Sequence, residues 1–476
     1  MTESPPPLDK VDPAAAWKAW KPDDKQPWNL KWAGHLYRRA AFGGSPEELT
    51  AAVEDGLAAT LDRLLQGDKG TGDFYALLFP KDTKFEAGML LAKNNSARDL
   101  GGWWLYAMHY SPHPLLEKMT LFWHNHFVSS IAKVGRTPLM YEQNKCLRRN
   151  ALGKFGPFLL EISKDPAMLV YLDSNSNVKG KPNENYAREV MELFSLGVGN
   201  YTEKDVREAA RAFTGWHTTG ASFEFSAKDH DSDEKTFLGK TGAWDGEDIV
   251  RIILEQPACA RFLVRKLYRY FISETDEPPA ALLEPLAEAL RKSQYDIAAL
   301  VGTILRSRHF FSDYAYHRRV KSPVEFALGA VRAIAQRQVN PNVLIGRIDA
   351  MGQELFAPPN VKGWPGGKSW LNTATVLARH NFAEALASGT SEINQGGPIA
   401  AVIVDPDAFL RREKITDPDK ILDRLAALTL QDELSDKARA RLQAFFAEGK
   451  PEGDDLSRRV REAMHALMCM PEFQLA

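Results

Sequence analysis

Hydrophobic residues recur every three or four positions through most of the chain, the spacing that places them on one face of an α-helix. The clearest case is residues 181–216, KPNENYAREVMELFSLGVGNYTEKDVREAARAFTGW, where two such patterns meet at a corner containing Gly197 and Gly199. The second pattern begins with Thr202 and Asp205, which are spaced like a helix-capping box. These features predict a pair of helices, and we expect this pair to lie buried at the centre of the protein.

The rest of the pattern predicts an all-α (mainly α) fold, a large multi-helical domain with at most a small β-hairpin in a long loop. The hairpin is expected in residues 217–245, the longest stretch without helical spacing, where phenylalanines fall in short alternating runs. We expect an irregular N-terminal arm (1–31), a main helical domain (32–390) and a C-terminal helical cap packed on it (391–476). Helices are expected at residues 32–42, 45–65, 96–110, 115–131, 141–150, 155–163, 246–271, 278–292, 296–307, 322–337 and 372–387, with four more helical segments up to residue 470.

Composition and charge narrow the classes of function. With 60 basic and 62 acidic residues the net charge is close to zero, so no charge argument favours nucleic acid or an anionic membrane as a partner. Cys146, Cys259 and Cys469 have no paired spacing, so neither a disulfide framework nor a thiolate metal site is expected. The basic residues of 261–269 predict a solvated helix face.

The sequence as it stands predicts a cytoplasmic protein. Its first residues, MTESPPPLDKVDP, contain neither a basic n-region nor an apolar segment of the kind found in secretory signals. No stretch is long and apolar enough to be a transmembrane segment. A longer natural N-terminus would instead indicate an exported protein.

One face of the first helix in the 181–216 pair carries the first candidate site residues. Glu189 and Glu192 are three positions apart, so both carboxylates project from the same side of the helix. The alternative is a solvated face without a function. Arg188 lies at the edge of the apolar stripe, where an unpaired guanidinium would be unfavourable. We expect it to pair with a carboxylate from another segment, Asp173 and Asp231 being the candidates.

A histidine pair in the segment LFWHNHF supplies further candidates. His124 and His126 are two positions apart, so on a regular helix they point in nearly opposite directions and cannot both bind one metal ion. The zinc-binding helix pattern needs a spacing of four. For either histidine, a buried imidazole bonded to a backbone or carboxylate partner is the alternative to metal binding.

The 217–245 loop adds His230 and Asp231. The acidic run that includes them resembles a calcium loop, but Glu234 and Lys240 occupy the positions where that loop needs glycine and glutamate, so calcium is excluded. Further along, residues 366–369 end in Gly-Lys-Ser but lack the earlier glycine of a phosphate-binding loop. Residues 357–370 are instead expected to form a rigid loop pressed onto the core.

Several sequence blocks together resemble the bacterial "domain of unknown function 1800" family. The resemblance implies no established activity or catalytic residue. It implies a setting in which members often carry export signals and lie beside genes for sulfatase-like proteins, so a sulfatase-like partner is expected. The blocks are RRAAFG (38–43), LFWHNHF (121–127), PNENYAREVMELFSLGVGNYTEKDVREAARAFTGW (182–216), HDSDEKTFLG (230–239), QPACARFLVRKLYRYF (256–271), KSPVEF (321–326) and PPNVKGWPGGKSW (358–370).

Two functions of different class follow from these observations. The first is an accessory, binding or scaffold protein for an exported or surface partner. The alternative is a metal-dependent enzyme, a hydrolase or oxidoreductase that uses zinc, manganese or iron. That alternative requires one of the two histidines to lie within reach of Glu189 or Glu192, under the 217–245 loop. Its candidate catalytic residues are Arg188 and the candidate metal ligands His124, His126, Glu189, Glu192, His230 and Asp231.

Overall fold

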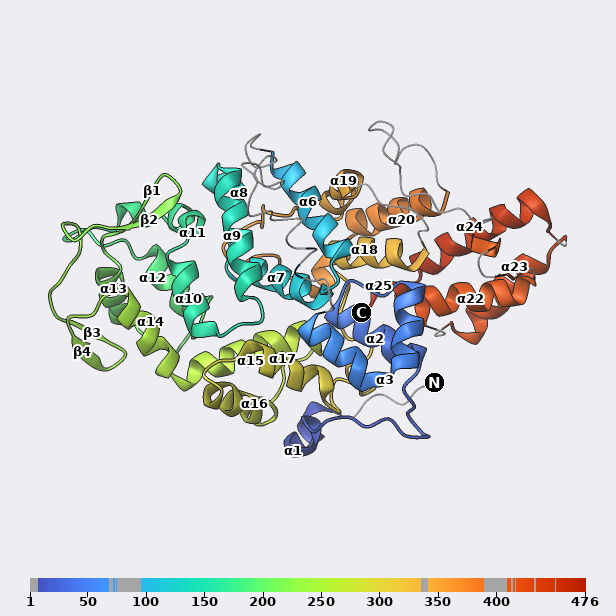
Figure 1. Cartoon of the computed structure of the whole chain (residues 1–476), viewed down its shortest axis with the longest axis horizontal. Coiled ribbons are helices and arrows are strands. Elements are labelled where there is room, and N and C mark those ends of the chain that lie inside the picture. The colour runs from blue at the N-terminus through green and yellow to red at the C-terminus, as the bar shows by residue number, and fades with distance from the viewer. Residues whose placement is uncertain are drawn as a thin grey trace.

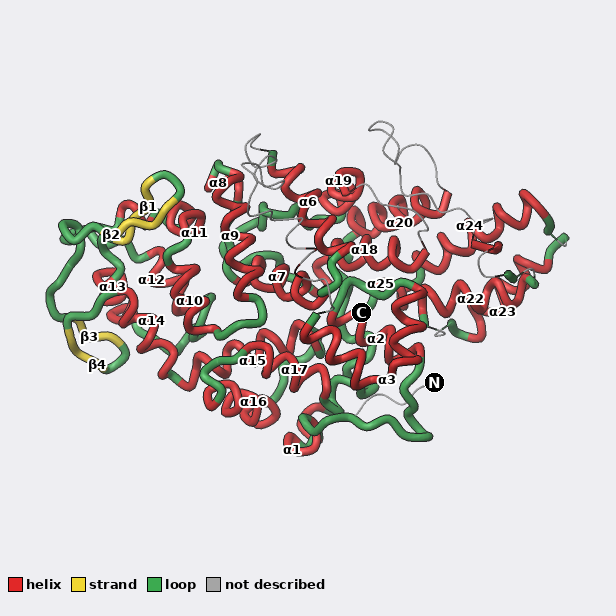
Figure 2. Tube along the Cα trace, viewed as in Figure 1, coloured by secondary structure: helices red, strands yellow, loops and turns green. Residues whose placement is uncertain are grey.

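The computed structural model describes residues 7–67, 96–334, 341–388, 417–431, 434–449 and 451–476, together with residues 72, 74, 409–411, 414 and 415. The described chain is mainly helical, with two small antiparallel hairpins near one end of an elongated molecule (Figures 1 and 2). The all-α prediction is therefore confirmed.

The helices of residues 7–212 follow the sequence pattern, except that the helix expected at 115–131 ends at His126 and a separate short helix begins at Ile131. Ser45 and Glu48 form the capping box that begins α3, and Thr202 and Asp205 form the one that begins α13. The helices are η1 (Leu8–Lys10), α1 (Pro13–Ala16), α2 (Leu30–Ala40), α3 (Pro46–Gln66), α6 (Ala97–Tyr110), α7 (Pro114–His126), α8 (Ile131–Val134), α9 (Thr137–Asn150), α10 (Phe155–Ser163), α11 (Pro166–Tyr171), η2 (Ser174–Ser176), α12 (Asn185–Glu192) and α13 (Glu203–Ala212).

The second half begins with the two hairpins and then returns to helices. Its elements are β1 (Trp216–Thr219), β2 (Ser222–Phe225), β3 (Lys235–Phe237), β4 (Lys240–Gly242), α14 (Gly246–Glu255), α15 (Pro257–Phe271), α16 (Ala280–Lys292), α17 (Ile297–Arg306), α18 (Pro323–Ile334), α19 (Pro341–Ala350), η3 (Gly367–Trp370), α20 (Thr373–Ser388), α22 (Pro418–Leu430), α23 (Asp436–Ala447), α24 (Gly453–Cys469) and α25 (Pro471–Gln474).

The segment after α13 forms two hairpins, one more than predicted. In the first, Trp216 pairs with Phe225, and in the second, Lys235 pairs with Gly242. The tight turn of the second hairpin places Leu238 and Gly239 at positive φ, as a two-residue hairpin loop with the twist of its strands requires.

The α12–α13 pair lies close to the hairpin end of the molecule, not at its centre as predicted (Figure 1). One face of α12 packs inward, with Tyr186 and Val190 buried, while Glu189 and Glu192 on the other face are half-buried. Helical spacing identifies an apolar face but not the distance of that face from the molecular centre, which explains the wrong prediction.

Buried apolar side chains fall mainly into two large clusters, and α7 contributes to both. Phe122 and Trp123 belong to the cluster that contains α10 and α12–α17, whereas Leu121 belongs to the cluster of α6, α18 and the C-terminal helices. Helix α7 therefore lies between the two parts of the molecule that these clusters define, which we call its two halves (Figure 1). Side chains near its C-terminal end are positioned where these halves meet.

Both ends of the chain pack on the helical body. In the N-terminal arm, the indole of Trp17 donates a hydrogen bond of 2.7 Å to the carbonyl of Leu282 on α16. At the other end, α24 packs on α20 and α22 packs on α18. The division at residues 31 and 390 stays a prediction, and residues 391–408 lie outside the described part of the chain. None of the described helices combines the length and apolar character that crossing a membrane requires.

Candidate functional site

A cleft of about 290 Å³ lies where the two halves meet. It is formed by the end of α7, one side of α15, the segment that leads into α18 and the loop of residues 353–370. Its basic lining residues are Lys266, Arg269, Arg319 and Lys362, its acidic ones are Glu274 and Glu325, and Asn125, His126, Trp364 and Trp370 are among the others.

The two acidic residues of the cleft are already engaged. Glu325 is buried and forms ion pairs with Lys118 behind the cleft and with Arg319, at 3.3 Å from the latter. Burial opposes ionisation of Glu325, but these two cations outweigh it and hold its pKa far below the ordinary value. Glu274 accepts a hydrogen bond from the backbone N–H of Val320 and lies 3.9 Å from Arg319.

Lys266 is the best-positioned cation of the cleft. Its Nζ lies 3.1 Å from Nδ1 of His126 and 3.4 Å from the carbonyl oxygen of Leu193, at the end of α12. Burial lowers the pKa of Lys266 to about 8. Among the ion pairs that join described residues, none involves Lys266 or Lys362, so both cations are available to a ligand.

The 357–370 loop, which was expected to press onto the core, forms one side of the cleft. Gly363 has a φ of +79°, and a Cβ on it would come within 2.1 Å of the side-chain oxygen of Asn125. Asn125 accepts a hydrogen bond of 2.7 Å from the backbone N–H of Trp364 and donates one to the carbonyl of the same residue. Only glycine therefore allows the loop to lie this close to the end of α7.

The two histidines of LFWHNHF are both buried, and each is bonded to the backbone. Nε2 of His124 accepts a hydrogen bond of 3.2 Å from the N–H of Phe356, and its ring packs among Trp104, Phe356 and Trp364. Burial lowers the pKa of His124 to about 3. The pKa of His126 is also well below its ordinary value, first because of burial and then because of the Lys266 charge. Both imidazoles are therefore neutral at physiological pH.

Arg188 does not pair with Asp173 or Asp231 as predicted. It forms ion pairs with Glu203 at 2.7 Å and Glu184 at 2.9 Å, on the partly exposed side of the α12–α13 pair. Lys133 pairs instead with Asp173. Glu203 belongs to another segment, as predicted, but the two candidate carboxylates were wrong. Glu184 is one helical turn from Arg188, and the turn into α13 brings Glu203 next to it.

Glu189 and Glu192 remain on one face of α12. Burial, followed by the charge of Glu192, raises the pKa of Glu189, whereas the charges of Arg188 and Lys362 lower it less. Glu192 accepts a hydrogen bond of 2.8 Å from the hydroxyl of Tyr201.

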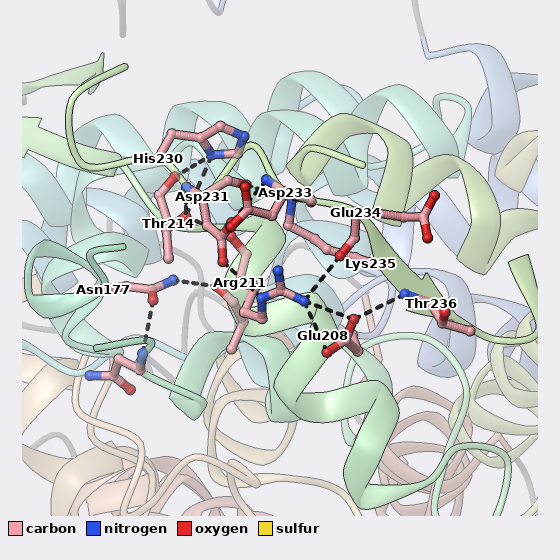
Figure 3. A network of polar contacts seen from close by, with 12 residues as sticks. Asn177, Glu208, Arg211, Thr214, His230, Asp231, Asp233, Glu234, Lys235 and Thr236 are labelled. Atoms are coloured by element: carbon pink, nitrogen blue, oxygen red, sulfur yellow. Dashed lines mark hydrogen bonds and ion pairs between the residues drawn. The ribbon is translucent and has the colours of Figure 1, made fainter. Parts of the chain in front are cut away.

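His230 and Asp231 belong to a separate polar network, which fixes the loop between the two hairpins on α13 (Figure 3). Asp231 accepts a hydrogen bond of 2.7 Å from Arg211, and its backbone N–H donates to the hydroxyl of Thr214. Burial opposes ionisation of Asp231, but the bonds from Arg211 and from the N–H of Asp233 lower its pKa. His230 bonds the carbonyl of Thr214 through Nδ1. The hydrogen bonds of His230 and Asp231 within this network therefore account for their positions, and a structural role explains both residues.

The predicted metal ligands lie on three segments, α7, α12 and the loop that packs on α13, and of these ligands only His126 is among the residues that line the cleft. His126 lines the cleft, His124 lies in an aromatic pocket, the two glutamates lie on α12, and residues 217–245 contribute no lining residue to the cleft. Within the described ranges, no group of three or more His, Cys, Asp or Glu side chains has the geometry to hold a metal ion. The predicted ligand set does not fit a zinc, manganese or iron centre in this arrangement.

Sequence reasoning missed most residues of the cleft. The basic residues near α15 were expected on a solvated face, which is correct for Arg261 and Arg265, exposed residues that pair with Glu284 and Glu277. It is wrong for Lys266, whose side chain turns into the cleft. The signal that could have found them is the set of sequence blocks that carry the family resemblance. Four of these blocks supply lining residues of the cleft: LFWHNHF, QPACARFLVRKLYRYF, KSPVEF and PPNVKGWPGGKSW.

The comparison with protein-family profiles agrees with the sequence resemblance, and the other comparisons found no match. The chain has no significant match among curated proteins or among solved structures. The profile of the family described as "Protein of unknown function (DUF1800)" matches residues 35–475, nearly the whole chain, and the protein therefore belongs to that family.

Proposed function

We propose that this protein is a binding protein and that its central cleft holds the oxyanion group of an anionic ligand. The observation that carries the proposal is the charge of the lining, where four basic side chains face two acidic ones. Since Glu274 and Glu325 already bond other groups, Lys266 and Lys362 are the cations that a ligand would neutralise.

The position of Lys266 supports this proposal. A half-buried ammonium with only a neutral imidazole and a carbonyl as partners gains electrostatic energy when an anion enters. Lys362 is exposed on the loop at the mouth and adds a second donor. The amine nitrogens of two lysines match a tetrahedral or carboxylate oxyanion without requiring the planar geometry of an arginine pair.

The aromatic lining adds an apolar wall beside the charged one. Trp364 and Trp370 border the same cleft. A ligand that combines a ring with an anionic group, such as a sugar ester, would use both walls. A sulfate ester would also connect this site with the sulfatase-like partner that the family resemblance implies, in an accessory role for an exported or surface protein.

The metal-dependent enzyme stays the alternative prediction. No feature of the cleft favours it, because His126 donates through Nε2 to a carbonyl and accepts at Nδ1 from Lys266. A metal ion at His126 would first have to displace Lys266.

The experiment is a calorimetric titration of the protein with inorganic sulfate and with glucose 6-sulfate. We expect saturable binding, weakened by roughly 10- to 100-fold in Lys266→Met, because a hydrogen bond to a charged group contributes about 1.5–3 kcal/mol. Lys362→Met should weaken binding less, since Lys362 is exposed. Lys292→Met is the matched control, a lysine exposed on α16 outside the cleft.

Absence of saturable binding for both sulfates would contradict the proposal. Equal affinity of Lys266→Met and the unaltered protein would contradict the role of the cleft. Circular dichroism of every variant separates a binding defect from a folding defect.

A further inference from the structure

Glu325 also lines a second, much smaller chamber. It has a volume of about 20 Å³ and lies between the end of α2, the start of α18 and the end of α22. Arg38, Lys321, Glu325 and Gln431 give it polar walls, and Phe42 and Phe473 are among its apolar ones. A space of this size holds one water molecule or one monatomic ion.

Arg38 is the unexplained group of this chamber. Its side chain is 6% exposed, and none of its three guanidinium nitrogens has a hydrogen-bond partner. The ring of Tyr316 lies 5.4 Å from the guanidinium, which is a weak cation–π contact. Leaving a buried guanidinium without an acceptor is costly, so an occupant that accepts hydrogen bonds is expected here.

The surroundings of the chamber carry an excess of positive charge. Arg38 and Lys321 line it, and Arg39, Lys118, Arg319 and Arg379 are buried around it. The carboxylate of Glu325 in its wall is shared by Lys118 and Arg319 and also accepts the N–H of Ser322. Burial and the charges of Arg38 and Arg379 hold the pKa of Lys321 well below its ordinary value. Histidines nearby add no charge, since burial lowers the pKa of His317 to about 2.

We propose that this chamber is a binding site for a monatomic anion, chloride under ordinary conditions, held by the guanidinium of Arg38 and the ammonium of Lys321. The anion accepts the N–H groups that Arg38 otherwise leaves unused. Its charge offsets the mutual repulsion of the cations that join α2, α18 and α20. The small volume, compared with about 290 Å³ for the cleft, favours a monatomic ion over sulfate, phosphate or a carboxylate, which distinguishes this site from the cleft.

A water molecule is the competing occupant. Water would accept from Arg38 and donate to the side-chain oxygen of Gln431, which also has no partner. It would leave the charge of the cluster uncompensated, and Lys321 would then lose its proton to relieve the repulsion. The two occupants therefore differ in their dependence on halide.

The test combines crystallography with thermal unfolding of the full chain. Crystals grown in sodium bromide should show an anomalous peak inside the chamber, within hydrogen-bond distance of Arg38. The unfolding midpoint should be higher in sodium chloride than in sodium gluconate of the same ionic strength, because an ion that binds only the folded state stabilises it. Arg38→Met should remove this difference, and Arg261→Met, an exposed arginine on α15, should retain it.

A chamber without an anomalous peak, together with equal midpoints in the two salts, would establish water as the occupant and overturn the proposal. If Arg38→Met does not fold, Arg38→Lys provides the second test, since it keeps the charge and should retain a weakened chloride effect. Lys266→Met should leave the bromide peak in place, so failure of this site and failure of the cleft are distinguishable.

Discussion

Lys266 donates a hydrogen bond of 3.1 Å to Nδ1 of His126, an imidazole that is itself fixed by the backbone. Nε2 of His126 lies 3.0 Å from the carbonyl oxygen of Phe194, which can only accept, so Nε2 carries the hydrogen and Nδ1 is the acceptor. This relationship places a lysine amine in the cleft without a neutralising carboxylate.

We expect anion binding in the cleft to weaken as the pH rises through about 8. Burial lowers the pKa of Lys266 to about 8, so its charge, and with it the attraction for an anion, is present below that pH and lost above it. Calorimetric titrations with sulfate between pH 6.5 and 9.5 measure the effect. Lys266→Met should bind weakly at every pH, and a pH profile unchanged by this substitution would assign the titration to another group.

Glu325→Gln should destabilise the fold by about 3–5 kcal/mol, because it leaves two buried cations without their carboxylate. Lys118 and Arg319 both pair with Glu325 in the interior. Urea unfolding followed by circular dichroism gives the free energy of unfolding. Glu277→Gln, which removes an exposed pair with Arg265, should change it by less than about 1 kcal/mol.

A double substitution checks this explanation. If the loss comes from an uncompensated charge, Lys118→Met in the Glu325→Gln background should recover part of the stability. A further loss equal to that of Lys118→Met alone would indicate that the two residues act independently.

Gly363→Ala should destabilise the protein more than Gly239→Ala, although both glycines have a φ of +79°. A Cβ at Gly239 meets no atom within 4 Å, so that substitution costs only the left-handed backbone, about 1–2 kcal/mol. A Cβ at Gly363 would clash with Asn125, which raises the expected cost to about 3 kcal/mol or more. Thermal unfolding compares the two, and equal losses would mean that the loop can move away from α7.

Arg211→Met should loosen the 226–238 segment. It removes the partly buried ion pairs with Asp231 and Glu208, and we expect a loss of about 1–3 kcal/mol. Hydrogen exchange should become faster in the second hairpin, β3–β4, which packs on α13. Arg251→Met is the control, because it removes exposed ion pairs within α14. It should change the free energy of unfolding by less than about 0.5 kcal/mol and leave hydrogen exchange unchanged.

We expect protein purified without a histidine tag and dialysed against zinc to contain far less than one metal ion per chain. Both histidine rings are bonded to the backbone, and no group of three or more His, Cys, Asp or Glu side chains in the described ranges could hold a metal ion. Elemental analysis provides the measurement. One equivalent of retained zinc that is lost in both His124→Gln and Glu189→Gln would restore the metal-enzyme alternative.

The local structure could be predicted well from sequence. The boundaries of α10 and the cap of α13 agree with their predictions, and residues 217–245 form hairpins. These features depend on residues within a few positions of each other, so periodicity and capping chemistry are sufficient to predict them.

The candidate site could be predicted only in fragments. His126 was predicted as a site residue, but as a metal ligand. The carboxylates proposed for Arg188 were wrong, because nearer carboxylates compete with distant ones for the guanidinium. Lys266 has the same local context as the exposed Arg265 beside it, and only the packing of α15 against α7 and α12 places one in the cleft and the other in solvent.

The sequence by itself determined the helices, the turns and the family, because spacing, caps and glycines act through local backbone preferences. Only the tertiary structure decided which charged side chains are buried away from water and which groups they contact. The lowered pKa of Lys266, the tautomer of His126 and the unpartnered Arg38 all result from contacts or burial involving segments far apart in the chain. Burial and electrostatic energy depend on distance in space, and no local pattern in the sequence records that distance.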